Sequence, residues 1–328
     1  IRSVRPDVAR WGAGSEQATL RKLDRAMRAF FRRCSAGGTP GYPRFKAAHR
    51  FDSVVWPSPG DGCGWLPDTK RVRLQGIGHV AVTVHRPVEG RVKTVQVKRE
   101  GRRWYLVLSC DDVPERPLPA TGAVVGIDVG VASFLTTSDG AHISNPRHGR
   151  AGSGRLALAQ QALALKKRGS ANRRDQRAVV ANRHRKIANQ RRDFHHQTAR
   201  RLVEAYDLIA LEELAVKNMA RSAAGTLAEP GVNVAAKSGL NRSILDAGWA
   251  QFANLIVSKA EEAGRRVVFV NPRHTSQRCA ECGHVNRGNR VTQAAFRCRA
   301  CGHTAHADVN AAHNILRAGL AHPDARAS

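Results

Sequence analysis

Two Cys-x-x-Cys pairs near the end of the chain place the strongest constraint on its fold. Cys279 and Cys282 form the first pair, Cys298 and Cys301 form the second, and 15 residues separate the two pairs. Each pair precedes a Gly-His dipeptide, whose glycine lets the backbone turn tightly around the sulfur atoms. The spacing predicts a structural zinc ribbon with one Zn²⁺ held by four thiolates, which leaves no open position for catalysis. The alternative is four free thiols that share this spacing by chance.

The charge balance indicates a polyanionic partner. The 328 residues carry 54 Lys and Arg against 26 Asp and Glu, a formal net charge of +28. Neutralised phosphates reward such a surface, so nucleic acid is the expected partner, with an anionic membrane as the alternative. The sequence has no run of about 18 apolar residues and no signal-peptide pattern, so we expect no membrane partner. An odd number of cysteines argues against a disulfide framework. We expect a cytoplasmic, nucleoid-associated protein of a prokaryote.

The first 120 residues predict a helical segment followed by a β-rich one. Apolar residues recur at helical spacing over residues 15–34, and a Gly- and Pro-rich loop follows. This loop sets Tyr42 beside Arg44 and Lys46, a combination suited to stacking on bases and gripping phosphates, although an ordinary ordered loop remains the alternative. Residues 51–120 alternate with period two, which predicts a small antiparallel β-barrel or sheet with a basic solvent face.

A different pattern begins near residue 121. An apolar strand from Ala123 carries Asp128 between Gly126 and Gly130, and these glycines leave room for a metal or a phosphate to approach the backbone. Two long basic helices are expected from residue 154 to 206, broken at Gly169 and Ser170. Their arginine density favours contact with a polyanion over a merely solvated face. The candidate nucleic-acid contacts there are Arg173, Arg174 and Arg177.

Acidic residues follow two predicted strands and begin a third element. A buried strand at residues 208–211 delivers Glu212 and Glu213 at its end. A polar loop at 221–239, a helix at 241–264 and a buried strand within residues 265–272 are expected next, and a last helix carries Asp308. Carboxylates converging from Asp128, a strand end and a final helix suit two Mg²⁺ ions and phosphodiester hydrolysis. This is the layout of a ribonuclease-H-like nuclease; scattered structural acids are the alternative.

Several sequence blocks carry a resemblance to a known family. They are LDRAMRAFFRR, GYPRFK, GIDVGVASFLTTSDG, RRDFHHQTARRLVEAYDLIALEELAVKNM, LNRSILDAGWAQF, HTSQRCAECG, FRCRACG and ADVNAAHNIL. They occur in order over about nine-tenths of the chain. The sequence resembles the TnpB family, the OrfB proteins of a bacterial insertion-sequence group, which are similar to type V CRISPR effectors through a RuvC-like nuclease domain.

The resemblance implies a catalytic triad of Asp128, Glu212 and Asp308, and it prefers Glu212 over Glu213. It implies an α/β, ribonuclease-H-like (RuvC-like) nuclease domain with a zinc-ribbon insertion, preceded by a small antiparallel β-barrel with a helical N-terminal segment. The expected domains are residues 1–50 (a basic segment, the remnant of a longer recognition region), 51–120 (barrel), 121–274 (nuclease core with a basic helical hairpin), 275–302 (zinc ribbon) and 303–328 (final helix and tail).

The implied function is RNA-guided cleavage of double-stranded target DNA in the service of a transposon, with Mg²⁺ at the acids, structural Zn²⁺ and a guide RNA as partner. Family members carry a longer region before the first helix, so we expect this chain to be a fragment. One rival is a zinc-ribbon nucleic-acid-binding regulator whose nuclease core no longer cuts, although the presence of all three acids argues against it. The other is an actin-like or sugar-kinase ATPase, suggested by the GIDVG strand, but a second strand of that kind is not found.

Overall fold

The structure, a computed structural model, describes residue 7 and residues 10–47, 50–226 and 228–323. Parts of the predicted segments 1–50 and 303–328 lie outside these described residues. The chain divides into two compact units, residues 1–114 and residues 115–328. Within the described ranges, no helix is both long enough and apolar enough to cross a membrane.

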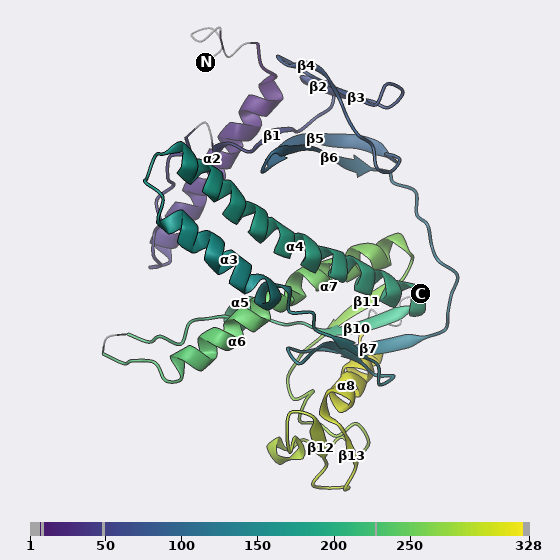
Figure 1. The fold of residues 1–328 in the computed structure, drawn as a ribbon. Helices are drawn as coiled ribbons and strands as arrows, with labels where there is room; N and C mark the ends of the chain where they lie inside the picture. The colour runs from purple at the N-terminus through teal and green to yellow at the C-terminus, as the bar shows by residue number, and fades with distance from the viewer. Residues whose placement is uncertain (1–6, 8–9, 48–49, 227, 324–328) are drawn as a thin grey trace. The chain divides into compact units, whose positions relative to one another are not determined.

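The described residues of the first unit form one long helix and six strands, which Figure 1 labels. These are α2 (Ala13–Ser35), β1 (Ser53–Trp56), β2 (Cys63–Leu66), β3 (Arg71–Leu74), β4 (Gly78–Ala81), β5 (Arg91–Glu100) and β6 (Arg103–Asp111). Helix α2 confirms the helix predicted for residues 15–34. The strands form two antiparallel sheets, with the orders β1-β5-β6 and β2-β3-β4.

The prediction of one barrel or one sheet for the β-rich segment needs correction. Its strands are antiparallel as expected, but they belong to two three-stranded sheets, and the described residues form no closed barrel. Strands β2, β3 and β4 are only four residues long and pair with each other alone. The two sheets share a small core of Trp56, Cys63, Val72, Leu74 and Val95, so burial joins them instead of hydrogen bonds.

The described residues of the second unit combine a five-stranded sheet with six α-helices, one short 3₁₀ helix and the cysteine-rich ribbon. Its strands are β7 (Val124–Val129), β8 (Ser133–Thr137), β9 (His142–Ser144), β10 (Leu208–Glu212), β11 (Arg266–Val270), β12 (Ala295–Arg297) and β13 (Thr304–His306). Its helices are α3 (His148–Ala164), α4 (Ala171–Ala205), α5 (Val216–Met219), α6 (Val234–Ala247), α7 (Trp249–Glu262), α8 (Ala307–Ala321) and the short 3₁₀ helix η2 (Arg287–Asn289).

The five-stranded sheet has the order β11-β10-β7-β8-β9. Strands β10 and β11 run parallel to β7, whereas β8 is antiparallel to both β7 and β9. From β7 the chain adds β8 and β9 on one side, and it later returns to add β10 and β11 on the other side. The order in which strands are added therefore reverses at the β7–β10 junction. The fold is therefore mixed α/β, and the strands predicted at 208–211 and within 265–272 are both present, the second ending at Val270.

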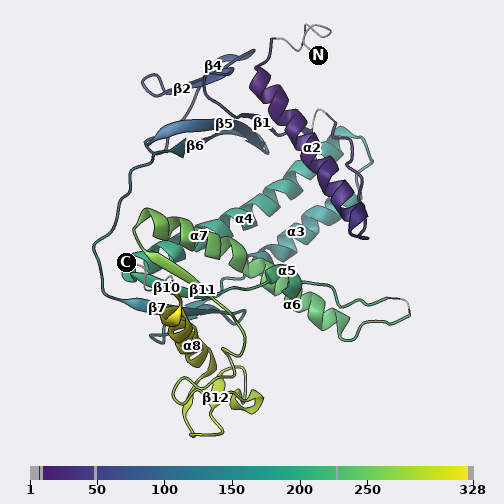
Figure 2. The ribbon, with the colours of Figure 1, turned by 180° about the vertical axis from the view of Figure 1, so that it is seen from behind.

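Helices cover both faces of this sheet, as Figures 1 and 2 show. Alternate residues of a strand point to opposite faces, and β10 illustrates the division. Ile209 and Leu211 join the core formed with α4 and α7, whereas Leu208 and Ala210 join the core that contains Ile315 of α8. Both faces of the strand are buried, which explains its continuous apolar run.

Gly126 lets α8 lie directly against β7. A Cβ atom at this position would collide with the backbone carbonyl oxygen of Ala312 and would stand 2.5 Å from the backbone nitrogen of Leu316. The glycine therefore makes room for a helix, and the expectation that it leaves space for a metal or a phosphate is wrong. The close approach fixes the depth at which α8 meets the sheet.

The predicted basic helical hairpin is present. Helices α3 and α4 are separated by a turn at Gly169, which has a φ of +85°, and Ser170 caps α4 by accepting a hydrogen bond from the backbone N–H of Arg173. The Arg173 guanidinium donates to the carbonyl oxygens of Leu163 and Lys166 at the end of α3. Arg173 thus joins the start of α4 to the end of α3 by hydrogen bonds.

The single helix predicted for residues 241–264 is two helices, and the polar loop expected at 221–239 already turns helical at Val234. The break falls at Gly248, which adopts φ +68° and ends α6. A Cβ atom on Gly248 would lie 3.1 Å from His195, and the buried His195 donates through Nε2–H to the carbonyl oxygen of Ala247 at 2.9 Å. A contact from α4 therefore stabilises the break.

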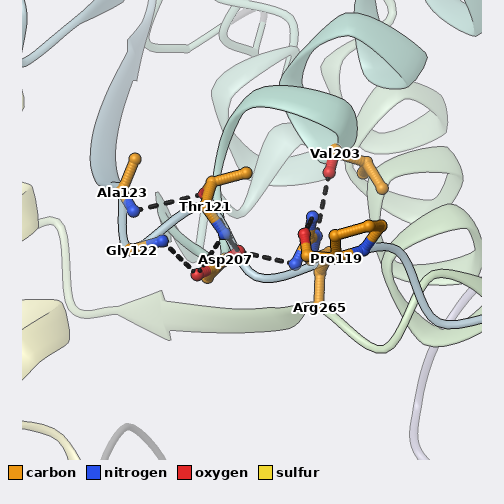
Figure 3. Close-up of polar contacts among 7 residues, drawn as sticks. All are labelled: Pro119, Thr121, Gly122, Ala123, Val203, Asp207 and Arg265. Atoms are coloured by element: carbon orange, nitrogen blue, oxygen red, sulfur yellow. Dashed lines mark hydrogen bonds and ion pairs between the residues drawn. The ribbon is translucent and has the colours of Figure 1, made fainter.

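A polar clamp holds the start of the second unit together (Figure 3). The Asp207 carboxylate accepts the backbone N–H groups of Thr121 and Gly122 at 2.7–3.0 Å, and it pairs with the Arg265 guanidinium at 2.5 Å. Arg265 also donates to the carbonyl oxygens of Val203 and Pro119. The clamp joins the segment before β7 to the end of α4 and the start of β11.

Candidate active site and metal centre

Two of the predicted acids lie side by side at the carboxyl ends of parallel strands. In the β7–β10 pairing Ile127 is opposite Leu211, so the next residues, Asp128 and Glu212, lie at the same level. Strand alternation turns both side chains away from the α4–α7 core and toward the face covered by α8. Both residues are half-buried.

The third predicted acid, Asp308, lies in the first turn of α8, the helix that packs on β7 at Gly126. His306 caps this helix, since its Nδ1 accepts the backbone N–H of Asp308. The structure therefore brings carboxylates from three separate elements to one side of the sheet.

The pKa of Asp128 responds to burial and to both other acids. The pKa of Asp128 is raised to about 8, first by burial and then by the negative charges of Glu212 and Asp308, while Arg290 acts in the opposite direction. Burial also raises the pKa of Glu212, and its hydrogen bond with Thr275 opposes that shift. A half-buried Asp128 carboxylate beside the negative charges of Glu212 and Asp308 is an arrangement that a bound cation would relieve.

Two polar partners orient these acids, and sequence reasoning did not identify them. The Thr275 hydroxyl donates to Glu212 Oε1 at 2.5 Å, and the Arg290 guanidinium pairs with Asp308 Oδ1 at 2.8 Å. Thr275 follows strand β11 at the same sheet edge, a position that could have marked it. Nothing in the sequence distinguishes Arg290 from the many other arginines, because its role depends on where the ribbon folds.

Glu213, the alternative to Glu212, occupies a different environment. Its side chain is exposed, and its backbone N–H donates to the carbonyl oxygen of Val270, which extends the β10–β11 pairing. Of these two glutamates, only Glu212 contributes to the raised pKa of Asp128. The structure therefore gives Glu212 and Glu213 different environments, although the chemistry of the two side chains is the same.

The four cysteines of the ribbon converge. Cys279, Cys282, Cys298 and Cys301 place their Sγ atoms within 4.8 Å of one another, with the closest pairs 3.6 and 3.7 Å apart. Sulfurs at about 2.3 Å from a tetrahedral Zn²⁺ lie about 3.8 Å from each other, so this cluster fits zinc.

The two cysteine pairs have the same backbone geometry. Gly283 and Gly302 both have a φ near +76° (76° and 77°), and each donates its N–H to the carbonyl oxygen of the first cysteine of its pair. The glycine after each pair thus has the role that the sequence indicated.

Two buried asparagines connect the ribbon to α8. Asn310 donates to the carbonyl oxygen of Arg278 and accepts the N–H of Ala280, so it binds the backbone on both sides of Cys279. Asn314 donates to the carbonyl oxygens of Thr275 and Arg278. The ribbon and the helix that carries Asp308 are therefore one hydrogen-bonded assembly.

The expected nucleic-acid contacts lie in two places. In the first unit Tyr42, Arg44 and Lys46 are exposed, and the Tyr42 ring contacts Phe30 edge-on at 5.2 Å. In the second unit Arg174 and Arg177 are exposed on α4, whereas Arg173 is half-buried in the hairpin turn. All of these residues stay predictions as binding residues.

Known proteins are similar to this sequence along most of its length. The family model described as "Probable transposase" (OrfB_IS605) matches residues 94–223, and the model "Cas12f1-like, TNB domain" matches residues 249–315. "Putative RNA-guided DNA endonuclease InsQ" of Escherichia coli K12 is 39% identical over 93% of this chain and 74% of its own length. "Putative RNA-guided DNA endonuclease" of Streptomyces pristinaespiralis is 38% identical over 70% of this chain.

Other relatives and a solved structure extend the comparison. The Cas12f1 endodeoxyribonuclease of Sulfoacidibacillus thermotolerans is 33% identical over 69% of this chain. The chain spans 53% of the length of this protein and of the Streptomyces protein. A solved Cas12f1–sgRNA–target DNA complex aligns over 68% of this chain at 22% identity with a TM-score of 0.43. The identity to the Escherichia coli relative along nearly the whole chain settles the assignment: this chain belongs to the TnpB/OrfB family of transposon-associated proteins.

Proposed function

We propose that this protein is a transposon-encoded, RNA-guided DNA endonuclease that hydrolyses phosphodiester bonds at Asp128, Glu212 and Asp308. The observation that carries the proposal is the convergence of these three carboxylates from β7, β10 and α8 on one face of the sheet. The names of the relatives, which describe RNA-guided DNA endonucleases, support the reaction class and the guide.

The architecture supports a ribonuclease-H-like, RuvC-like core. Three antiparallel strands, β9, β8 and β7, are followed by two strands parallel to β7, and helices cover both faces. In open α/β sheets, chemistry belongs at the carboxyl ends of strands where the connections change sides, and β7 and β10 meet there. Asp128 and Glu212 occupy that position.

The donor set fits Mg²⁺. Hard carboxylate oxygens suit this ion, and mutual repulsion leaves the acids in need of positive charge. Mg²⁺ ions bound by Asp128, Glu212 and Asp308 would supply Lewis-acid polarisation of the phosphate and an activated water. Thr275 holds the Glu212 carboxylate in one orientation, and Arg290 does the same for Asp308 while placing a positive charge beside the acids.

The zinc ribbon serves the acid site structurally in this proposal. One Zn²⁺ held by the four cysteines would fix the ribbon, and Asn310 and Asn314 would transmit that rigidity to α8. Guide RNA and target double-stranded DNA are the proposed partners, for which the basic composition provides affinity and base pairing provides specificity.

The nuclease-inactive regulator remains the second candidate, and the three acids disfavour it, because a protein that only binds has no use for mutually repelling carboxylates. Membership of the TnpB/OrfB family removes the ATPase alternative.

The test begins with the RNA that copurifies with the protein. Sequencing should reveal one discrete transcript, whose guide portion is then replaced to match a plasmid. The plasmid should be cut in Mg²⁺ and remain intact with chelator or with Asp128→Ala. Glu261→Ala, which removes an exposed carboxylate near the end of α7, is the matched control and should cut normally. Guided binding without Mg²⁺-dependent cutting would favour the regulator.

A further inference from the structure

Thr275 occupies one of the two oxygens of the Glu212 carboxylate. Its hydroxyl oxygen lies 2.5 Å from Glu212 Oε1 and 3.0 Å from the carbonyl oxygen of Pro272. A hydroxyl has a single proton, and a charged acceptor at the shorter distance binds that proton more strongly than a neutral one. Thr275 therefore donates to Oε1 whenever Glu212 is ionised, as it must be when it binds a metal ion.

The other oxygen of this carboxylate is free. None of the described residues donates a hydrogen bond to Glu212 Oε2, and Oε2 is not one of the enclosed polar atoms that lack a partner. Oε2 therefore has access to open space. The Glu212 carboxylate thus has one oxygen that is already bound and one that is available to a ligand.

The Thr275 hydroxyl is held in its position. The residue is only 7% exposed, and its β-branched side chain is stiff about χ1. Its carbonyl oxygen accepts a hydrogen bond from the side-chain amide of Asn314, which lies on α8 together with Asp308. The helix that carries one acid therefore fixes the residue that binds another, and Thr275 cannot leave Oε1 without a change in this contact.

The number of free carboxylate oxygens bears on which ion binds. Ca²⁺ is large and flexible in its coordination, and it accepts both oxygens of one carboxylate. Mg²⁺ is smaller and requires near-octahedral geometry, in which the two oxygens of one carboxylate lie too close together to take adjacent positions. A carboxylate whose second oxygen is hydrogen-bonded should therefore bind the two ions unequally.

We propose that Thr275 is a positioning residue that makes Glu212 bind its ion through Oε2 alone and thereby favours Mg²⁺ over Ca²⁺ at the acid site. This inference rests on the proposed function, because it takes the three acids as ligands of Mg²⁺. Thr275 acts through Glu212 and contacts neither the ion nor the DNA. Removing a hydrogen-bond partner of a metal ligand typically changes metal affinity by about 10–100-fold.

Thermal unfolding in graded Mg²⁺ or Ca²⁺, without nucleic acid, tests this preference. A bound ion raises the unfolding temperature, and the part of the rise that Asp128→Ala abolishes belongs to the acid site. Thr275→Val removes the hydroxyl but keeps the bulk of the side chain and the carbonyl oxygen that Asn314 binds. It should weaken Mg²⁺ binding about tenfold and leave Ca²⁺ binding as tight or tighter. Thr275→Ala, which removes the same hydroxyl with less bulk, should change the preference in the same way.

Two further variants serve as controls. Thr275→Ser keeps a hydroxyl and should restore the wild-type ratio of the two affinities. Ser276→Ala removes the hydroxyl of the neighbouring, half-buried residue and should leave both affinities unchanged. A merely structural role of Thr275 would weaken the binding of both ions in parallel. That result, or an unchanged ratio of affinities in Thr275→Val, overturns the proposal.

The role of Thr275 and the nuclease activity can fail separately. If Thr275→Val loses the preference for Mg²⁺ but the wild type cuts no guided DNA, the nuclease proposal alone fails. If the wild type cuts in Mg²⁺ but Thr275→Val keeps the wild-type preference, the role of Thr275 alone fails. A wild type in which neither ion raises the unfolding temperature through Asp128 overturns both.

Discussion

At the scale of single residues, the ionised Asp128 carboxylate should destabilise the folded protein when no metal is bound. A single substitution should reveal this effect. Its pKa is about 8 in the folded state, against about 3.9 for an unfolded aspartate. Between these values the folded state binds the extra proton, so stability falls as pH rises from about 4 to about 8. In chelator at pH 8, the free energy of unfolding of Asp128→Asn should therefore exceed that of the wild type by on the order of a few kcal/mol. The substituted protein should accordingly unfold at a higher temperature.

Thermal unfolding of both proteins at pH 4 and pH 8 checks this expectation. The difference should become small at pH 4, where the carboxyl group is protonated in the folded state and about half protonated in the unfolded state, and added Mg²⁺ should reduce it at pH 8. A substituted protein that is less stable than the wild type at pH 8 would show that burial and the neighbouring acids do not make the ionised Asp128 carboxylate costly in the folded state.

The neighbouring glutamates provide a second residue-level test. Glu212→Ala should abolish cleavage, because it removes one of the carboxylates that converge, together with the hydrogen bond that it accepts from Thr275. Glu213→Ala should retain much more activity, since Glu213 is exposed and contributes mainly its backbone N–H to the sheet. A denaturing gel of guided substrate, beside a binding titration, measures both. The reverse ranking would mean that the strand-end assignment is wrong.

The sequence could name these acids but not their partners. Asp128 and Glu212 end apolar strands, and Asp308 starts a helix, so local pattern was enough to select them as candidates. Thr275 and Arg290 reach the acids through the fold of the segment between β11 and α8, which no local periodicity encodes. The catalytic assignment itself stays a prediction, which the cleavage experiments above address.

At the scale of elements, the zinc ribbon and α8 should fail together. Cys279→Ser removes one of four sulfurs from a cluster that fits zinc, and structural zinc contributes directly to folding. The ribbon grips α8 through Asn310 and Asn314, so its loss should also loosen the helix that carries Asp308. Metal analysis should find about one zinc per chain in the wild type and almost none in the variant.

Limited proteolysis provides the structural readout for that variant. New cuts should appear in the ribbon and at the start of α8, while α4 stays protected. Cys34→Ser, which changes an exposed cysteine outside the ribbon, is the control and should keep its zinc. A zinc-free Cys279→Ser protein with an unchanged digestion pattern would contradict the coupling.

The helical hairpin separates two kinds of arginine. Arg177→Gln removes an exposed cation and should lower the slope of log affinity against log salt for single-stranded DNA by about 1, without changing stability. Arg173→Gln removes the donor to Leu163 and Lys166, so it should destabilise the hairpin by about 1–2 kcal/mol. Salt titrations and thermal unfolding of both variants measure this; equal behaviour would refute the distinction.

Element boundaries were predictable where local signals were strong. Ser170 after Gly169 marked the hairpin turn, and apolar runs marked β10 and β11. The break at Gly248 was not predictable, because glycine also occurs inside helices and the contact that stabilises the break comes from His195, far earlier in the chain. Likewise, period-two patterning revealed the strands of the first unit but could not show that they divide between two sheets, since sheet membership depends on long-range pairing.

At the scale of the whole molecule, each unit has its own hydrophobic core. Trp56 and Val95 belong to the core of residues 1–114, whereas Ile127, Phe252 and Ile315 belong to cores of residues 115–328. The segment before β7 belongs with the second unit by its hydrogen bonds: Leu118 N–H donates to Ala263, and the clamp of Figure 3 holds Thr121. A fragment of residues 115–328 should therefore fold by itself in a single cooperative transition.

The clamp predicts where such a fragment must begin. A fragment of residues 123–328 keeps every strand of the five-stranded sheet but loses Thr121 and Gly122, which donate to Asp207, and Pro119, which accepts from the buried Arg265. An unsatisfied buried polar group costs about 1–3 kcal/mol, so the loss of the Pro119 acceptor from the buried Arg265 should make the shorter fragment less stable by a similar amount. Urea unfolding of the two fragments measures the difference. Because only eight residues outside the sheet distinguish them, equal midpoints would mean that Asp207 and Arg265 do not depend on this segment.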